Sequence, residues 1–154
     1  MQLGIKPAFT HVSYYGRGPH ENYWDRKTGA ALGRYSSSIA EIGYDYIRPQ
    51  ENGNRSDCRW VEFSAEDGTR LRITGKPLID FSAWPYTMED LAFAEHIHEL
   101  PRRDAITLNI DSAQQGVGDL TSAVMGLPED AQLLAGNPCE FSFRIRMVDK
   151  SKPE

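Results

Sequence analysis

Apolar and polar residues alternate with period two in several short segments, which is the pattern of strands that bury one face. The clearest alternation runs through 141–147, and similar patterns occur at 106–110, 70–74 and 60–64. The segment 9–15 is rich in aromatic and β-branched residues and also favours a strand. One apolar and one polar face is typical of antiparallel sheets rather than buried parallel ones. The chain is therefore expected to be mostly β, with antiparallel pairing.

Turn signals separate these segments. Asp67-Gly68 lies between two alternating stretches and predicts a hairpin. The runs Gly16-Arg17-Gly18-Pro19, Glu51-Asn52-Gly53-Asn54 and Gly136-Asn137-Pro138 indicate further turns. In the first run, Gly16 and Gly18 are expected to adopt backbone conformations that are closed to other residues, and Pro19 to stiffen the turn.

One segment departs from the strand pattern and predicts a helix over 87–100. Thr87 and Asp90 have the spacing of a capping box, and Pro101 ends the run. On a helical wheel the apolar residues form one broad stripe, so an amphipathic helix lying against a sheet is expected. The stripe consists of Leu91, Phe93, Ala94, Ile97 and Leu100. Residues 1–148 are assigned to a single mostly-β domain or part of one, and 149–154 to a flexible tail.

The charge balance narrows the classes of partner. Lys and Arg number 17 against 22 Asp and Glu, which gives a net charge of -5. Nucleic acids and anionic membranes need a basic face, so neither is expected as the main partner. No apolar run approaches the ~20 residues that span a bilayer. For the two cysteines, Cys58 and Cys139, reduced thiols are favoured over a disulfide, which stays possible.

Several residues that suggest chemistry are ambiguous on sequence grounds. His96 and His98 lie two apart, and on a helix they point in nearly opposite directions, so they cannot share one metal ion. Glycoside hydrolysis needs two carboxyl groups, but none of the acidic residues stands in a local pattern that singles it out. No catalytic residue and no metal site is therefore assigned to this chain.

Two other features permit both a structural and a functional interpretation. Gly116-Val117-Gly118 lacks the third glycine of a dinucleotide fingerprint, and a plain glycine turn is the simplest interpretation. A set of aromatic residues offers platforms on which a sugar ring can stack, although core packing explains them equally well. These residues are Tyr14, Tyr15, Tyr23, Trp24, Trp60, Trp84 and Tyr86.

Longer motifs carry a specific resemblance. The stretch from Tyr14 to Arg26, YYGRGPHENYWDR, is similar to Y-x-G-x-G-P-x-E-N-Y-x-D-R of family 2 β-galactosidases. Residues 46–55 resemble that family's Y-x-x-P-x-E-N-G-x-R. Residues 81–100 resemble its S-x-Y…L-x-x-A-x-H-x-x-x-L, and residues 108–118 its L-x-I-D…G-x-G. The motifs follow the family's order and cover roughly residues 3 to 147.

The resemblance implies an antiparallel β-sandwich, which is the latter part of a galactose-mutarotase-like supersandwich. In the family this part lies in the C-terminal, small-chain region of the enzyme. In that family the catalytic glutamates and the magnesium ion belong to a central α/β barrel, which no part of this chain resembles. No cofactor is therefore expected on this chain. The expected partners are the catalytic barrel domain or large subunit of the same enzyme, and a carbohydrate, a galactoside.

The resemblance also nominates a substrate-contacting loop. In the family a loop just after G-x-G reaches the mouth of the active site, typically as G-G-D-D-S-W, and its tryptophan forms a platform for the aglycone sugar. This chain has no tryptophan there and reads Asp-Leu-Thr-Ser-Ala-Val-Met after Gly118. Gly118, Asp119, Thr121 and Ser122 are the substrate-binding residues that the resemblance implies, with the aglycone left open.

The expected function is that of a non-catalytic C-terminal domain or small subunit of a retaining β-galactosidase, which packs on the barrel and shapes the substrate pocket. The alternatives are a free-standing carbohydrate-binding module and, less favoured, a mutarotase-like sugar epimerase. In the 16–26 segment, Asp25 and Arg26 are expected to hold the loop by a charge-assisted bond, in an architectural role.

Association and location follow from the same interpretation. A homo-oligomer is expected for the isolated chain, because part of a sandwich leaves apolar faces and strand edges uncovered. The residues leave the location of the full protein open, with the cytoplasm favoured over the periplasm.

Overall fold

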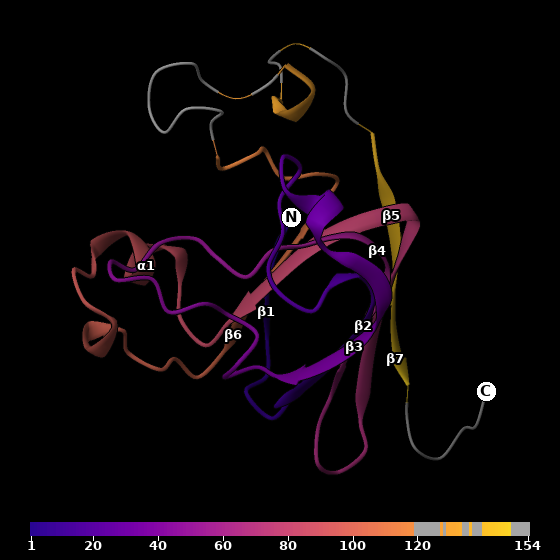
Figure 1. Cartoon of the computed structure of the whole chain (residues 1–154). Coiled ribbons are helices and arrows are strands. Elements are labelled where there is room, and N and C mark those ends of the chain that lie inside the picture. The colour runs from indigo at the N-terminus through magenta and orange to yellow at the C-terminus, as the bar shows by residue number, and fades with distance from the viewer. Residues whose placement is uncertain (119–126, 128, 134–135, 137–139, 149–154) are drawn as a thin grey trace.

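The computed structural model describes residues 1–118, 127, 129–133, 136 and 140–148. They form a seven-stranded antiparallel sheet in the order β1-β6-β5-β4-β2-β3, with β7 beside β5 (Figure 1). The strands are β1 Gln2–Ile5, β2 His11–Gly18, β3 Ala31–Ser38, β4 Arg55–Ser64, β5 Arg70–Trp84, β6 Ile106–Asp111 and β7 Ser142–Val148. The predicted mostly-β, antiparallel class is confirmed, and the arrangement is consistent with a β-sandwich.

The long strand β5 organises the sheet. Along one edge it pairs with β4, and along the other it pairs first with β7 and then with β6. The two halves are separated by a bulge, because Trp60 opposes Thr74 whereas Cys58 opposes Ile79. Gly75 opens this bulge, where a Cβ atom would lie 2.7 Å from the Leu78 carbonyl carbon. The bulge therefore divides the edge of β5 between two different partner strands.

The predicted hairpin at Asp67-Gly68 is confirmed between β4 and β5. Ser64 pairs with Arg70, and Gly68 adopts a φ of 86° that favours glycine. The Asp67 side chain accepts the backbone N–H of Thr69 at 2.8 Å, which closes the turn.

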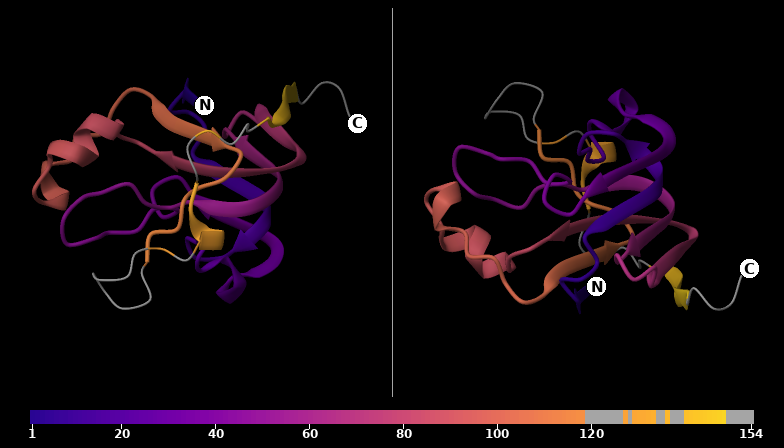
Figure 2. Two further views of the ribbon diagram at one scale, coloured as in Figure 1. Left: turned by 90° about the horizontal axis from the view of Figure 1, so that it is seen from above. Right: turned by 90° about the horizontal axis from the view of Figure 1, so that it is seen from below.

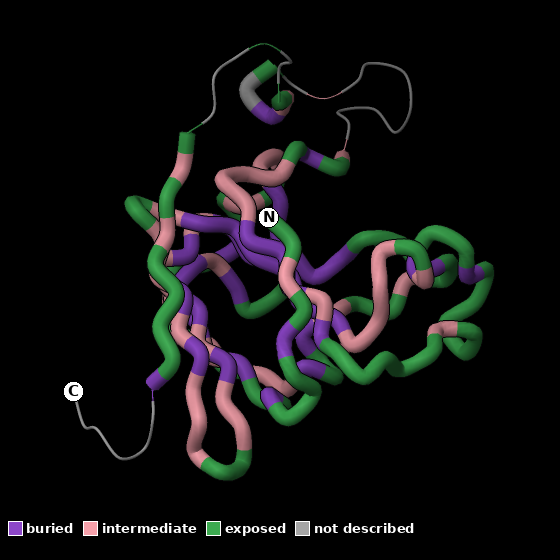
Figure 3. The backbone as a smooth tube through the Cα atoms, turned by 180° about the vertical axis from the view of Figure 1, so that it is seen from behind, coloured by how far each residue is buried: buried purple, intermediate pink, exposed green. Residues whose placement is uncertain are grey.

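Alternating residues of the strands bury one face of the sheet. Figure 3 shows that the buried positions concentrate in the central strands. Burial of each large aliphatic side chain contributes about 1.5–3 kcal/mol before the opposing loss of entropy is counted. Fully buried members include Val12, Val61, Phe63, Ile73, Ile79, Phe81, Leu108 and Ile110.

The strand β7 is less covered than its alternation predicts. Ile145 pairs with Ile73 and Met147 with Leu71, so these side chains lie on the same face of the sheet. Ile73 and Leu71 are buried, but Ile145 and Met147 are 46% and 57% exposed. Within the described part of the chain, this end of the apolar face is open.

The predicted helix is present but shorter. Helix α1 spans Met88–Phe93, and its capping box is confirmed, because Thr87 and Asp90 exchange side-chain to backbone hydrogen bonds. The chain leaves the helix at Ala94, with a ψ of 136°, and a separate 3₁₀ turn follows at Ile97–Glu99. The extension of the helix to residue 100 is therefore wrong.

A second capping interaction explains the break. The Glu99 carboxylate accepts the backbone N–H groups of Glu95 and His96, which a longer helix would direct to its own carbonyl groups. Of the predicted apolar stripe, Leu91 and Ala94 are buried, whereas Phe93 is 83% exposed.

Two long segments project on the same side of the sheet, 40–54 and 85–105 (Figure 2). The Trp84 indole N–H donates to the Asn52 carbonyl at 3.0 Å, which fixes the base of the first segment to the end of β5. Short 3₁₀ turns lie at Lys27–Gly29 and Glu129–Ala131. Among the described residues, no helix has both the length and the apolar character needed to cross a membrane.

Candidate functional site

The sequence places its candidate site at Gly118 and in the residues that follow. Gly118 is described, whereas Asp119, Thr121 and Ser122 lie outside the described residues. The part of the site with a defined geometry is therefore the segment Gln114–Gly118, which connects β6 to that stretch.

Strand β6 delivers this segment beside β5. Asp111, the last residue of β6, pairs with Asp80 of β5. Three residues later the Gln114 backbone N–H donates to Asp80 Oδ2 at 3.2 Å. The other carboxylate oxygen, Oδ1, accepts the Asp57 backbone N–H at 3.0 Å. One side chain thus joins the segment to both β5 and β4.

The Asp80 carboxyl group is deeply buried, with 2% of the residue exposed. Burial raises the pKa of Asp80 to about 6, although hydrogen bonds from Asp57, Ser56 and Gln114 act in the opposite direction. These donors are two backbone N–H groups and a hydroxyl. Such a group holds the chain at fixed points and is screened from any substrate.

A second carboxylate holds the far end of the segment. Asp25 Oδ2 accepts the Gly118 N–H at 2.7 Å, and Oδ1 accepts the Val117 N–H at 3.3 Å. One carboxylate thus accepts two successive backbone N–H groups, one on each oxygen. The Asp25 side chain is 8% exposed, and the Arg26 guanidinium lies 3.9 Å from it. The expected charge-assisted hydrogen bond between Asp25 and Arg26 is not formed, because at 3.9 Å the two groups make only a loose ion pair. The hydrogen bonds of the carboxylate go instead to a loop far along the sequence.

This contact explains the spacing of the two glycines. A Cβ atom on Gly116 would lie 2.8 Å from Asp25 Cγ, and one on Gly118 would lie 2.8 Å from Asp25 Oδ2. The backbone N–H of Gly116 donates to the Ala131 carbonyl at 3.0 Å. The Gly-Val-Gly run is therefore shaped by the carboxylate that it surrounds.

The two glycines of the 16–26 segment have a different role from the predicted one. Gly16 and Gly18 lie within β2, and neither has a positive φ. A Cβ atom on Gly16 would overlap Cys58 Sγ, and one on Gly18 would overlap the Tyr14 hydroxyl. The prediction that these two glycines adopt backbone conformations closed to other residues is wrong. Glycine is needed at both positions because a side chain would have no room.

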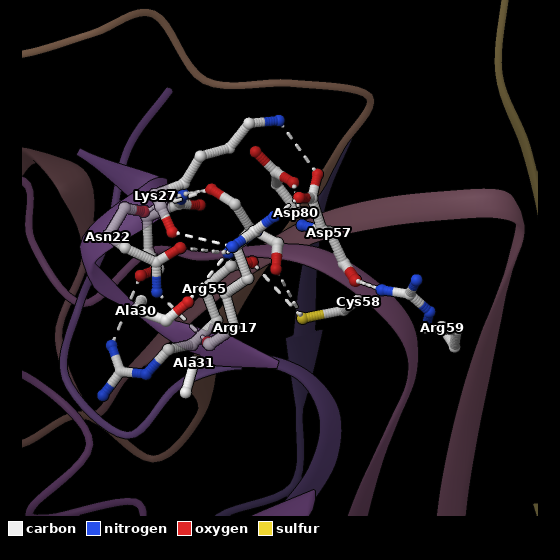
Figure 4. A network of polar contacts seen from close by, with 12 residues as sticks. Arg17, Asn22, Lys27, Ala30, Ala31, Arg55, Asp57, Cys58, Arg59 and Asp80 are labelled. Atoms are coloured by element: carbon white, nitrogen blue, oxygen red, sulfur yellow. Dashed lines mark hydrogen bonds and ion pairs between the residues drawn. The ribbon is translucent and has the colours of Figure 1, made fainter. Parts of the chain in front are cut away.

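An ion-pair network connects the 16–26 segment to Asp80 (Figure 4). Arg17 Nε lies 2.6 Å from Asp57 Oδ2, and Lys27 Nζ lies 3.1 Å from Asp57 Oδ1. Burial tends to raise the pKa of Asp57, but the bonds from these two cations outweigh it and hold the pKa below its usual value. Asp57 has a φ of 55°, which is uncommon outside glycine. Its backbone N–H points to Asp80.

Two of the family-like motifs pack directly on each other. Glu21 accepts the backbone N–H of Gly53 at 2.7 Å and the Tyr46 hydroxyl. Asn22 accepts the Ser56 N–H at 3.1 Å through Oδ1. The segment after β2 and the segment before β4 therefore form one hydrogen-bonded unit beside the candidate site.

Two further carboxylates lie near Gln114. Its side-chain amide donates to Glu51 at 3.4 Å and to Asp111 at 3.1 Å. Burial, and then the charge of Asp111, raise the pKa of Glu51. The amino group of Met1 lies 3.2 Å from Asp111. Gln114 thus bridges two acidic groups whose charges repel each other.

Most of the aromatic residues considered as platforms for a sugar ring are buried or lie against a cationic side chain. Trp84, Tyr14 and Tyr23 are buried, at 1%, 1% and 6% exposure. The Arg72 guanidinium covers the Trp60 ring at 4.2 Å, and the Lys27 ammonium lies 5.6 Å from the Trp24 ring. Core packing and cation–π contacts account for these aromatic residues.

The histidine pair differs from its prediction. His96 and His98 lie beyond the helix, and their rings stack with centroids 5.5 Å apart, so the expected opposite orientation is wrong. His96 Nδ1 lies 3.3 Å from Glu99 Oε1. Across the described residues, no three His, Cys, Asp or Glu side chains come together as a metal site. Cys58 is a buried free thiol, and Cys139 lies outside the described residues.

Sequence reasoning missed Asp80, Gln114 and Asp57. Asp80 carried a usable signal, because it is a charged residue inside the apolar run Leu78–Phe81 and such residues are rarely buried without a role. Gln114 and Asp57 contact Asp80 through backbone N–H groups, which any residue except proline carries. Their link to Asp80 therefore leaves no trace in side-chain chemistry.

The fold and the site define a β-rich domain that presents an anchored loop. The family model described as "Beta galactosidase small chain" matches residues 1–145. A β-galactosidase of Priestia megaterium is 42% identical over 118 residues, which cover 77% of this chain and 11% of that protein. A β-galactosidase of Streptococcus thermophilus is 32% identical over 150 residues, 97% of this chain and 15% of that protein. The chain belongs to the β-galactosidase small-chain family and spans about one-seventh or less of these relatives.

Proposed function

We propose that this chain is a non-catalytic C-terminal portion or small subunit of a retaining β-galactosidase. It packs on the catalytic barrel, as part of a galactose-mutarotase-like supersandwich, and forms one wall of the pocket that binds terminal β-D-galactosides. The observation that carries the proposal is the family match over residues 1–145, in a chain that spans 11–15% of the whole β-galactosidases it resembles.

The geometry of Asp80 does not suit it to act as a catalytic acid. A glycosidase needs an accessible acid with a raised pKa beside a second carboxylate. Asp80 has a raised pKa, but both of its oxygens accept backbone N–H groups and the residue is buried. Substrate cannot reach it without unfolding this part of the sheet.

Three carboxylates, those of Glu89, Asp90 and Glu99, line a surface hollow beside α1. Two of them, Asp90 and Glu99, have a lowered pKa, in contrast to Asp80. The Arg103 guanidinium binds Asp90 through two nitrogens, at 2.6 and 2.9 Å, and holds the pKa of Asp90 below its usual value. Backbone N–H groups and His96 lower the pKa of Glu99. Neither group is suited to donate a proton near neutral pH. In line with the family resemblance, the proposal places the acid, the nucleophile and magnesium on the rest of the enzyme.

The proposed contact with substrate is the stretch that begins at Gly118. Because Gly118 donates its N–H to Asp25, its contribution is the position of the backbone. Asp119, Thr121 and Ser122 supply polar side chains to the pocket wall in this proposal. The lack of tryptophan in this stretch predicts weaker stacking on the aglycone than a tryptophan platform gives.

The alternatives gain no support from the observed geometry. A free-standing carbohydrate-binding module that uses the two candidate tryptophans needs their faces open, whereas Trp84 is buried and Trp24 lies against Lys27. A mutarotase-like enzyme needs a histidine acid and a glutamate base that converge on substrate. The close pair His96 and Glu99 instead caps a 3₁₀ turn.

Alanine substitutions in the proposed wall test the assignment in the assembled enzyme. Asp119→Ala, Thr121→Ala and Ser122→Ala should raise KM for a chromogenic β-galactoside, since they remove pocket contacts and leave the catalytic carboxylates intact. Asp104→Ala, at an exposed position outside the site, is the matched control. Unchanged KM and kcat in all three wall variants would contradict a role in substrate binding.

A further inference from the structure

The segment Gln114–Gly118 is held largely through backbone N–H groups. Gln114 donates its N–H to Asp80, Gly116 to Ala131, and Val117 and Gly118 to Asp25. A short surface loop more often directs such N–H groups to water. Here four backbone donors of five consecutive residues have acceptors within the protein.

Two of these acceptors are carboxylates, and each is itself fixed. Asp80 also accepts the Asp57 N–H, and Asp57 is bound by Arg17 and Lys27. The Asp25 side chain is 8% exposed and lies against the two glycines. Hydrogen bonds to a carboxylate are shorter and stronger than those between neutral groups. The two ends of the segment are thus tied to β5 and to the 16–26 segment by carboxylate oxygens, at 3.2 Å from the Gln114 nitrogen and at 2.7 Å from the Gly118 nitrogen.

We propose that Asp25 and Asp80 are positioning residues that hold Gln114–Gly118 in one conformation, and so fix how the enzyme binds the leaving-group side of a β-galactoside. The proposal rests on the proposed function, because it requires that the residues after Gly118 border the substrate pocket. Neither aspartate touches substrate. Each acts through the backbone that it holds.

The two aspartates have distinguishable contributions. Asp25 binds adjacent to the proposed pocket wall, whereas Asp80 binds four residues further from it. A displacement of the backbone at Gly118 is expected to shift the next residue directly. A displacement at Gln114 is partly restrained by the contact between Asp25 and Gly118. Asp25→Asn should therefore affect the leaving-group preference more than Asp80→Asn does.

Hydrogen exchange in the assembled enzyme tests the anchoring directly. Asparagine keeps one acceptor oxygen but places an amide N–H₂ toward the second backbone donor. Asp25→Asn should speed exchange at the Val117 and Gly118 amides roughly tenfold or more, and Asp80→Asn should do so at Gln114. Asp104→Asn, an exposed substitution of the same type, should leave all three amides unchanged.

Steady-state kinetics with two β-galactosides that share galactose and differ in the leaving group test the positioning role. Lactose and a nitrophenyl galactoside are suitable. Asp25→Asn should change the ratio of their kcat/KM values roughly tenfold, since small displacements of a substrate-contacting wall have effects of this size. A purely structural role would lower both values together and leave the ratio unchanged.

The outcomes separate the two proposals. Unchanged exchange at Gln114, Val117 and Gly118 in both variants overturns the anchoring, whatever the activity. Faster exchange with an unchanged kcat/KM ratio overturns the positioning role. A wild-type assembly that hydrolyses neither substrate would instead contradict the proposed function. Aspartate-to-glutamate variants that restore slow exchange and also restore the ratio would support both steps.

Discussion

Asp25 Oδ2 accepts the backbone N–H of Gly118 at 2.7 Å and joins two segments that lie 93 residues apart. The contact leaves no room for a side chain at position 118. It connects the two most distinctive glycine-containing motifs of the chain, one after β2 and the other after β6.

Gly118→Ala should destabilise the protein by about 1–3 kcal/mol, the usual cost of forcing extra atoms into a packed site. The added Cβ atom would lie 2.8 Å from both Asp25 Oδ2 and Arg26 Nη2. Urea denaturation measures the change. Gly4→Ala in β1 is the matched control, because its Cβ atom meets nothing within 4 Å, and it should stay within about 0.5 kcal/mol of wild type. Equal stabilities of the two variants would contradict the contact.

Asp80 should give stability a distinctive dependence on pH. Its pKa is 3.8 without the fold's influence and about 6 in the folded protein, so between these values the folded state binds more protons. The contribution of this group to stability is therefore greatest below about pH 4 and falls as the pH rises to about 6.

Asp80→Asn should remove that slope, which amounts to about 2–3 kcal/mol over the range. Urea denaturation of both proteins at several pH values from 4 to 7 gives the difference, in which the other carboxyl groups cancel. Parallel pH dependences for wild type and variant would show that Asp80 titrates normally.

The buried Arg55 is expected to be essential for the segment 40–54. It is 5% exposed and donates to the Tyr14 hydroxyl and to the carbonyls of Ile42 and Gly53 at 2.9–3.0 Å. Arg55→Lys keeps the charge but loses the planar fork of donors, so it should cost about 2–4 kcal/mol. Arg48→Lys at an exposed position is the control. Similar thermal unfolding of both variants would rule out this role.

The open face of β7 predicts self-association of the isolated chain. Ile145 and Met147 are exposed although their partners in β5 are buried. Light scattering should detect a dimer or larger species, and Ile145→Lys together with Met147→Lys should shift it toward monomer. Arg144→Ala on the opposite face of β7 serves as the control. A monomeric wild-type chain at tens of micromolar would contradict the prediction.

Strong alternation made much of the fold predictable. The segment 70–74 alternates because one face is buried, and it lies in β5. The alternating residues 142–147 lie in β7, although Ile145 and Met147 stay exposed. The strand Ala31–Ser38 was missed because its residues are mostly exposed or half-exposed, so its pairing with β2 comes from backbone hydrogen bonds. The predicted helix was too long because a periodic pattern cannot reveal that the Glu99 carboxylate accepts the backbone N–H of His96.

The candidate site was predictable only in part. The Gly-Val-Gly run and the Asp25-Arg26 pair were both recognised, but no local pattern indicates that they meet, since 93 residues separate Asp25 from Gly118. Asp80 binds backbone N–H groups, so its partners Asp57 and Gln114 are set by the register of β4, β5 and β6. Such contacts depend on topology rather than on spacing along the chain.

A titration tests the accessory role most directly. A β-galactosidase portion that contains the catalytic barrel but lacks the region equivalent to this chain is held at constant concentration, and the chain is added in increasing amounts. Hydrolysis of a nitrophenyl β-D-galactoside should rise and saturate at one chain per barrel, while the chain alone gives no hydrolysis. Hydrolysis by the chain alone, or no increase at any ratio, would contradict the role of a non-catalytic portion that completes the enzyme.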